Sequence, residues 1–284
     1  MNYALHILTM IGLTLPNLLG YNLIFGRGKI LHFGPIGVSL TSAYAIFLTQ
    51  RATGSVLFAL FAGLLAALLI SAFFAWLALR LESDALGILT IAMHLALLAV
   101  VLNWSSLTRG ALGLSGIQRM PGLQSLPIFA AFSVAIGVAW ILLMHAVHRS
   151  SLGRRLSALA ENRAHAEALG ISRMNVIFSV FLLGGIGAFL TSVLYPQYVS
   201  LLHPNDYQFN GLILFVMCIV AGGPGSVRGV TLATILILCL QEAIRFLPLP
   251  HQLIGPVRLI VFGLILITAV FVRRREIFPM QRSI

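Results

Sequence analysis

A few polar and ionisable side chains lie inside long apolar stretches of this 284-residue sequence. An ionisable group at membrane depth is costly, so each one is a candidate for a transport pathway. We take His32, His94 and Glu242 as such candidates. Asn17, Asn22 and Asn103 are polar but neutral, and of these Asn22 joins the pathway candidates. The competing interpretation for the asparagines is a hydrogen bond to a neighbouring helix. Glu242 and Arg245 are three residues apart, a spacing that predicts a pair on one helix face.

Reactive side chains do not gather into the patterns of an enzyme. The sequence shows no Ser/His/Asp or Cys/His arrangement, no pair of carboxylates and no metal-ligand spacing. Cys218 and Cys239 both lie inside apolar runs, which predicts neither a disulfide framework nor a metal site. These residue types therefore argue against a catalytic membrane enzyme.

A glycine-rich stretch from Gly222 to Ser226 superficially resembles a phosphate-binding loop. It lacks the Gly-Lys-Ser/Thr ending of such loops and follows an apolar run, so a nucleotide site is disfavoured. In membranes, small residues let helices approach closely or break. We interpret the stretch as a helix interruption and include Gly222 and Gly223 among the pathway candidates. An early stretch, Gly34 to Gly37, is a possible counterpart in an inverted repeat.

Residues 148–175 form the one substantial segment that is not apolar. Apolar residues recur there near helical spacing, which predicts a short amphipathic helix ending at Gly170. Such a helix could lie on the bilayer with its arginines on anionic lipid, or could dock onto a partner protein. For docking, the charged residues would pair with charges on the partner's rim.

The composition requires that apolar surface faces something other than water. Hydrophobic residues make up 59% of the chain, charged residues 9%, and the mean hydropathy is +1.00. Ordinary soluble domains have about 25% charged residues. Soluble enzymes, disordered regulators and disulfide scaffolds are thereby excluded. The fold class predicted is an all-α polytopic membrane protein in contact with lipid.

About nine apolar segments, with a range of eight to ten, approach the roughly 20 residues that a spanning helix needs. The opening stretch lacks the pattern of a cleavable signal, so we expect it to remain as the first membrane helix. The segments around the glycine stretch are short, so one of them could be a half-helix. The predicted segments are Ala4–Ile24, Ile30–Leu48, Ser55–Leu79, Ala85–Leu102, Leu126–Val147, Val176–Leu194, Tyr207–Ala221, Val230–Ile244 and Leu253–Val272.

The formal net charge of +11 is explained by orientation in a membrane and not by nucleic acid. With the N-terminus outside and nine crossings, 13 of the 18 Lys and Arg residues fall inside and 5 outside. Because basic residues concentrate on the cytoplasmic side, the C-terminus is predicted to be cytoplasmic. The densest basic cluster is the 148–175 segment, which places it inside the cell.

The 148–175 segment also carries a family resemblance. The segment comes close to the pattern S-x-L-G-R-x-x-x-A-x-x-E-N-x-x-A-A-x-x-L-G. The matching residues are Ser151 to Leu156, Glu161-Asn162 and Glu167 to Gly170. This pattern resembles the permease subunits of branched-chain amino-acid ABC importers. The Glu-Ala-Leu-Gly ending resembles the coupling loop with which such permeases contact their ATPases. The resemblance implies that the residues of this contact are Gly153, Arg154, Arg155, Glu161, Asn162, Glu167, Ala168 and Gly170.

Further segments match the same family in its order, between about residue 20 and residue 245. One departure is Arg109, which stands where the family usually has glycine. The loop around Thr108 resembles that of the subunit which pairs with a second, related permease, and Thr108 joins the pathway candidates. The matching segments are Gly20 to Asn22, His32 to Gly34 with Ala43-Tyr44, Arg80 to Asp84 with Thr90, Leu107 to Leu114 with Ile117, and Val220 to Ser226 with Gly229.

The resemblance implies one transmembrane permease domain over residues 1–284 in the bacterial inner membrane. Its implied partners are a second permease, two cytoplasmic ATPase subunits and a periplasmic solute-binding protein. ATP and Mg²⁺ would belong to the ATPases, so no cofactor is expected on this chain. The implied substrates are branched-chain amino acids, which are zwitterions with apolar side chains.

Other functions remain open at this point. A permease of the same family could carry urea, short amides or another small polar solute. An ion-coupled secondary transporter would need intramembrane carboxylates, of which the sequence has hardly any. A structural membrane subunit would not need the coupling loop.

Overall fold

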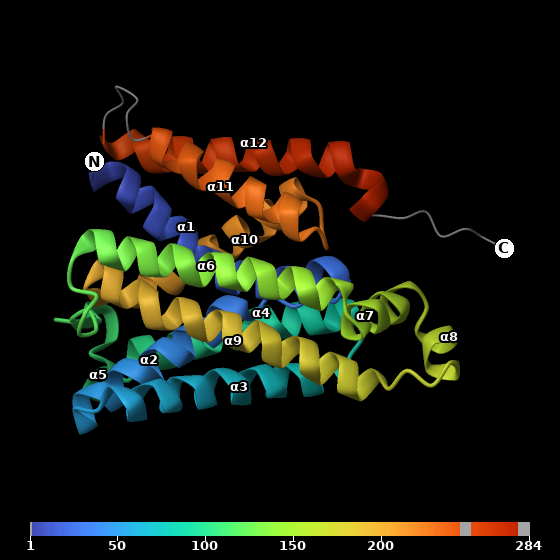
Figure 1. Ribbon diagram of the computed structural model, residues 1–284, viewed down its shortest axis with the longest axis horizontal. Coiled ribbons are helices and arrows are strands. Elements are labelled where there is room, and N and C mark those ends of the chain that lie inside the picture. The colour runs from blue at the N-terminus through green and yellow to red at the C-terminus, as the bar shows by residue number, and fades with distance from the viewer. Residues whose placement is uncertain (1, 245–250, 278–284) are drawn as a thin grey trace.

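Long helices lie side by side along the longest axis of the protein, as the computed structural model shows (Figure 1). The structure describes residues 2–244 and 251–277. The elements are α1 (Asn2–Tyr21), the π-helix η1 (Asn22–Arg27), α2 (Pro35–Thr53), α3 (Val56–Arg80), α4 (Ser83–Asn103), α5 (Ser105–Thr108), the 3₁₀ helix η2 (Gly110–Leu112), β1 (Leu114–Ser115), α6 (Leu126–Arg149), α7 (Ser151–Glu161), α8 (Arg163–Ala168), α9 (Arg173–Val199), β2 (Leu201–Leu202), the 3₁₀ helix η3 (Pro204–Tyr207), α10 (Phe209–Gly222), α11 (Val227–Ala243) and α12 (His251–Ile277).

Five of these helices are long and apolar enough to cross a membrane. They are α1 continued by η1, then α3, α4, α6 and α9. The nine predicted segments all overlap helices, and the helical, multi-pass fold class is consistent with this. The exact number of crossings stays a prediction, because the remaining helices do not meet the same criteria of length and hydropathy.

The second predicted segment begins too early. Ile30 was expected to start a helix, but residues 28–34 are not helical and α2 starts at Pro35. Proline suits the first helical turn because it lacks the N–H that would be unsatisfied there, and it disfavours helical geometry in the residue before it. Two backbone N–H groups of this non-helical segment donate to side chains of α4. The N–H of Leu31 donates to Ser83 Oγ at 3.2 Å, and that of Phe33 donates to Thr90 Oγ1 at 2.9 Å.

Two central helices, α1 and α9, pack closely and are joined to α2 by polar side chains. A Cβ added to Gly20 of α1 would lie 3.0 Å from the Cα of Gly184 in α9, so a larger residue would push the helices apart. Asn17 donates to Ser39 Oγ of α2 at 2.8 Å, and Ser192 of α9 donates to the Ser39 carbonyl at 2.9 Å. For Asn17, the interpretation as a helix-to-helix hydrogen bond is therefore confirmed.

The end of the bundle that carries α5 is built from irregular chain and one short strand pair (Figure 1). Leu114 pairs with Leu202, and Ser115 pairs with Leu201, in antiparallel register. Thr108 Oγ1 holds the preceding turn by donating to the carbonyls of Val101 at 2.6 Å and Trp104 at 2.8 Å. The opposite end carries α7 and α8. We refer to these as the strand end and the α7–α8 end.

Candidate functional site

The amphipathic segment folds as two helices, α7 and α8, and not as the single helix that we predicted. The break is at Asn162, whose backbone is extended and whose Oδ1 accepts from the His165 N–H at 3.1 Å. Asparagine is a preferred N-cap because its side chain satisfies a helix-starting N–H. Ser150 has the same role for α7, where its Oγ accepts from the Gly153 N–H at 3.5 Å.

Helix α7 is anchored to the bundle by its buried face. Leu156 is 1% exposed, and Gly153 is buried beside the end of α6. The Arg27 side chain at the end of η1 donates from Nε to the Gly153 carbonyl at 3.1 Å. No local pattern in the sequence predicts this hydrogen bond, because it joins residues that are 126 positions apart.

Helix α8 projects from the bundle at the far end of Figure 1. Only its Ala166 is buried, whereas Leu169, just after the helix, is 82% exposed. The chain then turns at Gly170, which has a φ of +81°. The Gly170 N–H donates to Glu167 and the Ile171 N–H donates to Ala166, which together form a Schellman motif. The predicted helix stop at Gly170 is confirmed.

The charged residues predicted for docking are partly used within this chain. Arg163 and Glu167 form an ion pair of 2.9 Å, and Arg154 donates to the Arg149 carbonyl at 2.8 Å. Arg155 and Glu161 are exposed. Ala168 and Asn162 are exposed as well, on or beside α8. The contact of these residues with an ATPase stays a prediction.

A second arginine ties the α7–α8 end to a membrane helix. Arg173 begins α9 and donates to the carbonyls of Ala78 at 2.7 Å and Leu79 at 3.1 Å, near the end of α3. Cationic donors satisfy helix carbonyls that have no partner within their own helix. The chain that follows α8 is thereby fixed to α3.

The structure brings Asn22 together with the glycine-rich stretch. Gly222 ends α10, and Gly223 follows with a φ of +92°. Beyond this turn, the Gly225 N–H donates to Asn22 Oδ1 at 2.9 Å, and Asn22 is fully buried in η1. An interrupted helix therefore meets a π-helix, and both have backbone groups that a regular helix would not leave available. The inverted repeat stays a prediction.

His32 lies in a closed aromatic pocket next to this junction. Its ring centroid is 4.7 Å from that of Phe74 and 5.0 Å from that of Phe181, and it is 2% exposed. Tyr21 lies at 6.5 Å and is 1% exposed. The hollow between these residues measures about 10 Å³, which is about one water molecule. In this conformation, the hollow has no room for an amino acid.

The remaining pathway candidates do not join this cluster. His94 is fully buried in α4, and a Cβ added to Gly37 of α2 would lie 3.1 Å from His94 Nδ1. Thr108 holds the turn at the strand end. Glu242 accepts from the Tyr3 hydroxyl at 2.7 Å and lies 3.7 Å from His6 Nε2. Its predicted partner, Arg245, lies outside the described residues.

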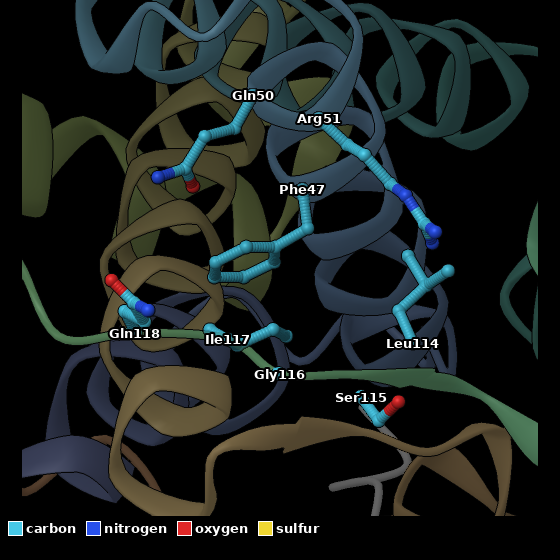
Figure 2. A pocket seen from close by; sticks show the side chains of 8 residues that line it. All are labelled: Phe47, Gln50, Arg51, Leu114, Ser115, Gly116, Ile117 and Gln118. Carbon is cyan, nitrogen blue, oxygen red and sulfur yellow. The ribbon is translucent and has the colours of Figure 1, made fainter.

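A larger hollow of about 350 Å³ lies at the strand end, between the last turns of α2 and the segment that contains β1. Figure 2 shows Phe47 in its middle, with Gln50 and Gln118 on one side and Arg51 on the other. Leu114, Ser115, Gly116 and Ile117 complete the lining. The sequence does not predict this site, because its two walls are more than 60 residues apart in the chain.

Asp206 is an acidic residue of the nearby turn η3. The surrounding protein removes part of its water and raises the pKa of its carboxyl, while His203 and the Tyr195 hydroxyl lower it. Within residues 2–244 and 251–277, no group of three or more His, Cys, Asp and Glu side chains could hold a metal ion.

The features of the described part of the chain that could bind a solute or a partner are thus the hollows, the projecting helix pair and the interrupted helices.

Comparisons with known proteins agree with this arrangement. The profile of the family described as "Branched-chain amino acid transport system / permease component" matches residues 3–270. The high-affinity branched-chain amino acid transport system permease protein LivM is 25% identical over 268 residues in Escherichia coli and 25% over 259 residues in Salmonella typhimurium. These alignments cover 84% and 80% of this chain, and 62% and 60% of the relatives.

A third relative has another solute in its name. The autoinducer 2 import system permease protein LsrD of Photorhabdus temperata is 26% identical over 160 residues, which are 51% of this chain and 46% of that protein. The chain thus spans about half to three fifths of the curated relatives that it matches. No solved structure gives a significant match. Because the family profile matches nearly the whole chain, this protein belongs to the branched-chain amino acid transport system permease family.

Proposed function

We propose that this chain is the permease subunit of an ATP-driven importer for branched-chain amino acids. It forms the translocation path together with a second, related permease. Two cytoplasmic ATPase subunits act on it from inside, and a periplasmic solute-binding protein delivers the substrate from outside. The chain itself hydrolyses nothing.

The observation that carries this proposal is the projecting pair α7 and α8. A permease driven by ATPases needs a rigid element that seats in a groove of the partner and transmits a push. The pair has this form, since α7 is anchored through Leu156 and the Arg27–Gly153 bond while the tip around Leu169 is exposed. Helix α9, which follows the tip, is bonded to α3 through Arg173. A push on α8 would therefore reach α9 and α3.

The charge distribution supports a cytoplasmic position for this element. Basic residues gather at the α7–α8 end, where a positive excess favours the inner side of the membrane. The strand end would then face the periplasm and the binding protein. The basic residues on and beside the two short helices are Arg149, Arg154, Arg155, Arg163 and Arg173.

The substrate assignment rests on the relatives. The two LivM proteins are named for branched-chain amino acids, and LsrD is named for autoinducer 2. Uptake of radiolabelled leucine, isoleucine and valine by the reconstituted importer tests the leading assignment, with urea and autoinducer 2 as competitors. Uptake of labelled urea or autoinducer 2 in the same proteoliposomes, with no uptake of the three amino acids, would contradict the assignment.

The coupling role is tested by charge reversal on the exposed tip. Glu161→Lys is expected to reduce co-purification of the ATPases and uptake at least tenfold, because a desolvated charge pair would become a repulsion. Glu82→Lys is the matched control, since Glu82 is also exposed at this end but precedes α4. If Glu161→Lys retained the ATPases and the uptake of the wild type, α7 and α8 would not be the coupling element.

A further inference from the structure

The 350 Å³ hollow at the strand end combines a cation, amide groups and an apolar floor. Its floor consists of Phe47, Leu114 and Ile117, which are 5%, 3% and 9% exposed. Arg51, Gln50 and Gln118 stand around this floor, as Figure 2 shows. Ligand pockets commonly have this composition, with apolar walls and a few placed polar groups, and their volumes start at about 300 Å³.

Arg51 is available to a ligand. Within the described part of the chain it forms no ion pair, and it is exposed. Arg119, also at the strand end, is engaged, because it donates to the Gln124 carbonyl at 2.9 Å and lies over the Phe129 ring. A guanidinium group binds a carboxylate through two parallel hydrogen bonds, and this geometry is specific as well as strong.

The wall opposite α2 is held in place from both sides. Leu114 and Ser115 pair with β2, and the Met120 N–H donates to the buried Gln197 Oε1 at 2.9 Å. At Gly116, nothing lies within 4 Å of the position that a Cβ would occupy, so the wall is open to solvent there. A site held by its surroundings loses little entropy when a ligand binds.

We propose that this hollow is a low-affinity site for a free amino acid with an apolar side chain, at the outer mouth of the permease. Arg51 binds the carboxylate, and the side-chain carbonyl oxygens of Gln50 and Gln118 accept from the ammonium. The aliphatic side chain lies on Phe47 and Ile117. The choice of ligand rests on the proposed function.

The test measures binding of radiolabelled leucine to the purified permease in lipid nanodiscs, without binding protein or ATPases. Arg51→Gln is expected to weaken leucine binding about tenfold or more, because a charge-assisted bidentate pair is lost. Leucinol, which lacks the carboxylate, is expected to bind weakly and equally to both proteins. Ser115→Trp, which keeps the charge and fills the hollow, is also expected to weaken leucine binding.

Arg109→Gln is the matched control, because Arg109 lines a neighbouring hollow with Arg51 but does not line this one. Its affinity for leucine should stay within twofold of the wild type. Equal losses in both arginine variants, an unchanged affinity in Arg51→Gln, or no saturable leucine binding by the wild type would each overturn the proposal.

Two further measurements distinguish this proposal from the proposed function and from a docking role for Arg51. Leucine uptake by the complete importer tests the proposed function, so uptake without leucine binding in nanodiscs would overturn the outer site alone. Binding in nanodiscs without uptake would overturn the proposed function alone. If Arg51→Gln weakened capture of the loaded binding protein and left leucine binding unchanged, Arg51 would serve docking and the amino-acid site would be overturned.

Discussion

The α7–α8 end carries two short helices, of which α8 projects from the bundle, whereas the strand end is made largely of irregular chain (Figure 1). At the first, α8 extends beyond the bundle and exposes Leu169. At the second, the segment around β1 folds over the end of α2 and leaves a hollow. A projecting helix is suited to enter a groove on another protein, and a hollow is suited to receive a ligand. The two ends of one bundle therefore differ in shape.

The largest expected difference between the two ends comes from proline substitution at two matched glycines. Gly170 and Gly54 each end a helix with a positive φ, of +81° and +69°, in open space. Each also donates its N–H to the preceding helix, at 2.9 and 2.8 Å. Proline removes this N–H and cannot adopt a positive φ, so both Gly→Pro variants should lose about 1–3 kcal/mol of stability.

Only Gly170→Pro is expected to lower uptake and ATPase co-purification, by at least tenfold. Thermal unfolding in detergent checks that both variants lose similar stability, and uptake in proteoliposomes checks the difference. Similar uptake by the Gly54→Pro and Gly170→Pro proteins would show that the two ends do not differ in coupling.

The next largest effect compares one arginine from each end. Arg173→Leu should lower the free energy of unfolding by about 2–3 kcal/mol, because two charged hydrogen bonds to the end of α3 are lost. Arg119→Leu removes one exposed hydrogen bond and a contact with the Phe129 ring, so about 1 kcal/mol is expected. Chemical denaturation in mixed micelles measures both. A larger loss for Arg119→Leu would mean that the strand end is the more tightly fixed.

The smallest effect concerns the ion pair on α8. Arg163 and Glu167 are 61% and 41% exposed, so solvent screens their attraction. Glu167→Gln should therefore change stability by less than about 0.5 kcal/mol. A marked loss of ATPase co-purification, with stability unchanged, would show that Glu167 acts on a partner and not within α8.

The sequence predicts the helical elements well where each depends on local pattern. Apolar stretches predict the long helices, and Gly170 predicts the end of α8. The segment 28–34 was missed because Ile30 to Phe33 are mostly apolar, and only Pro35 marks the true helix start. The break at Asn162 was missed because the apolar spacing continues across it, although asparagine is itself a capping residue.

The candidate site is predicted less completely, for a physical reason. The contacts that define it join distant parts of the chain, such as Asn22 with Gly225 and Arg27 with Gly153. Contacts between such distant residues produce no recognisable local pattern in the sequence. One wall of the hollow beside Arg51 is held by the pairing of β1 with β2, and two-residue strands show no recognisable pattern in the sequence.

The six-residue π-helix η1 has a thermodynamic consequence. Arg27 at one end of it is bonded to α7, and Asn22 at the other end is bonded to the turn after Gly223. The turn after Gly223 and helix α7 are thus both bonded to the same short segment. Coupling between two binding events is reciprocal. If the ATPases favour one arrangement of η1, a solute held at the glycine break must alter their affinity by the same factor by which they alter the solute's.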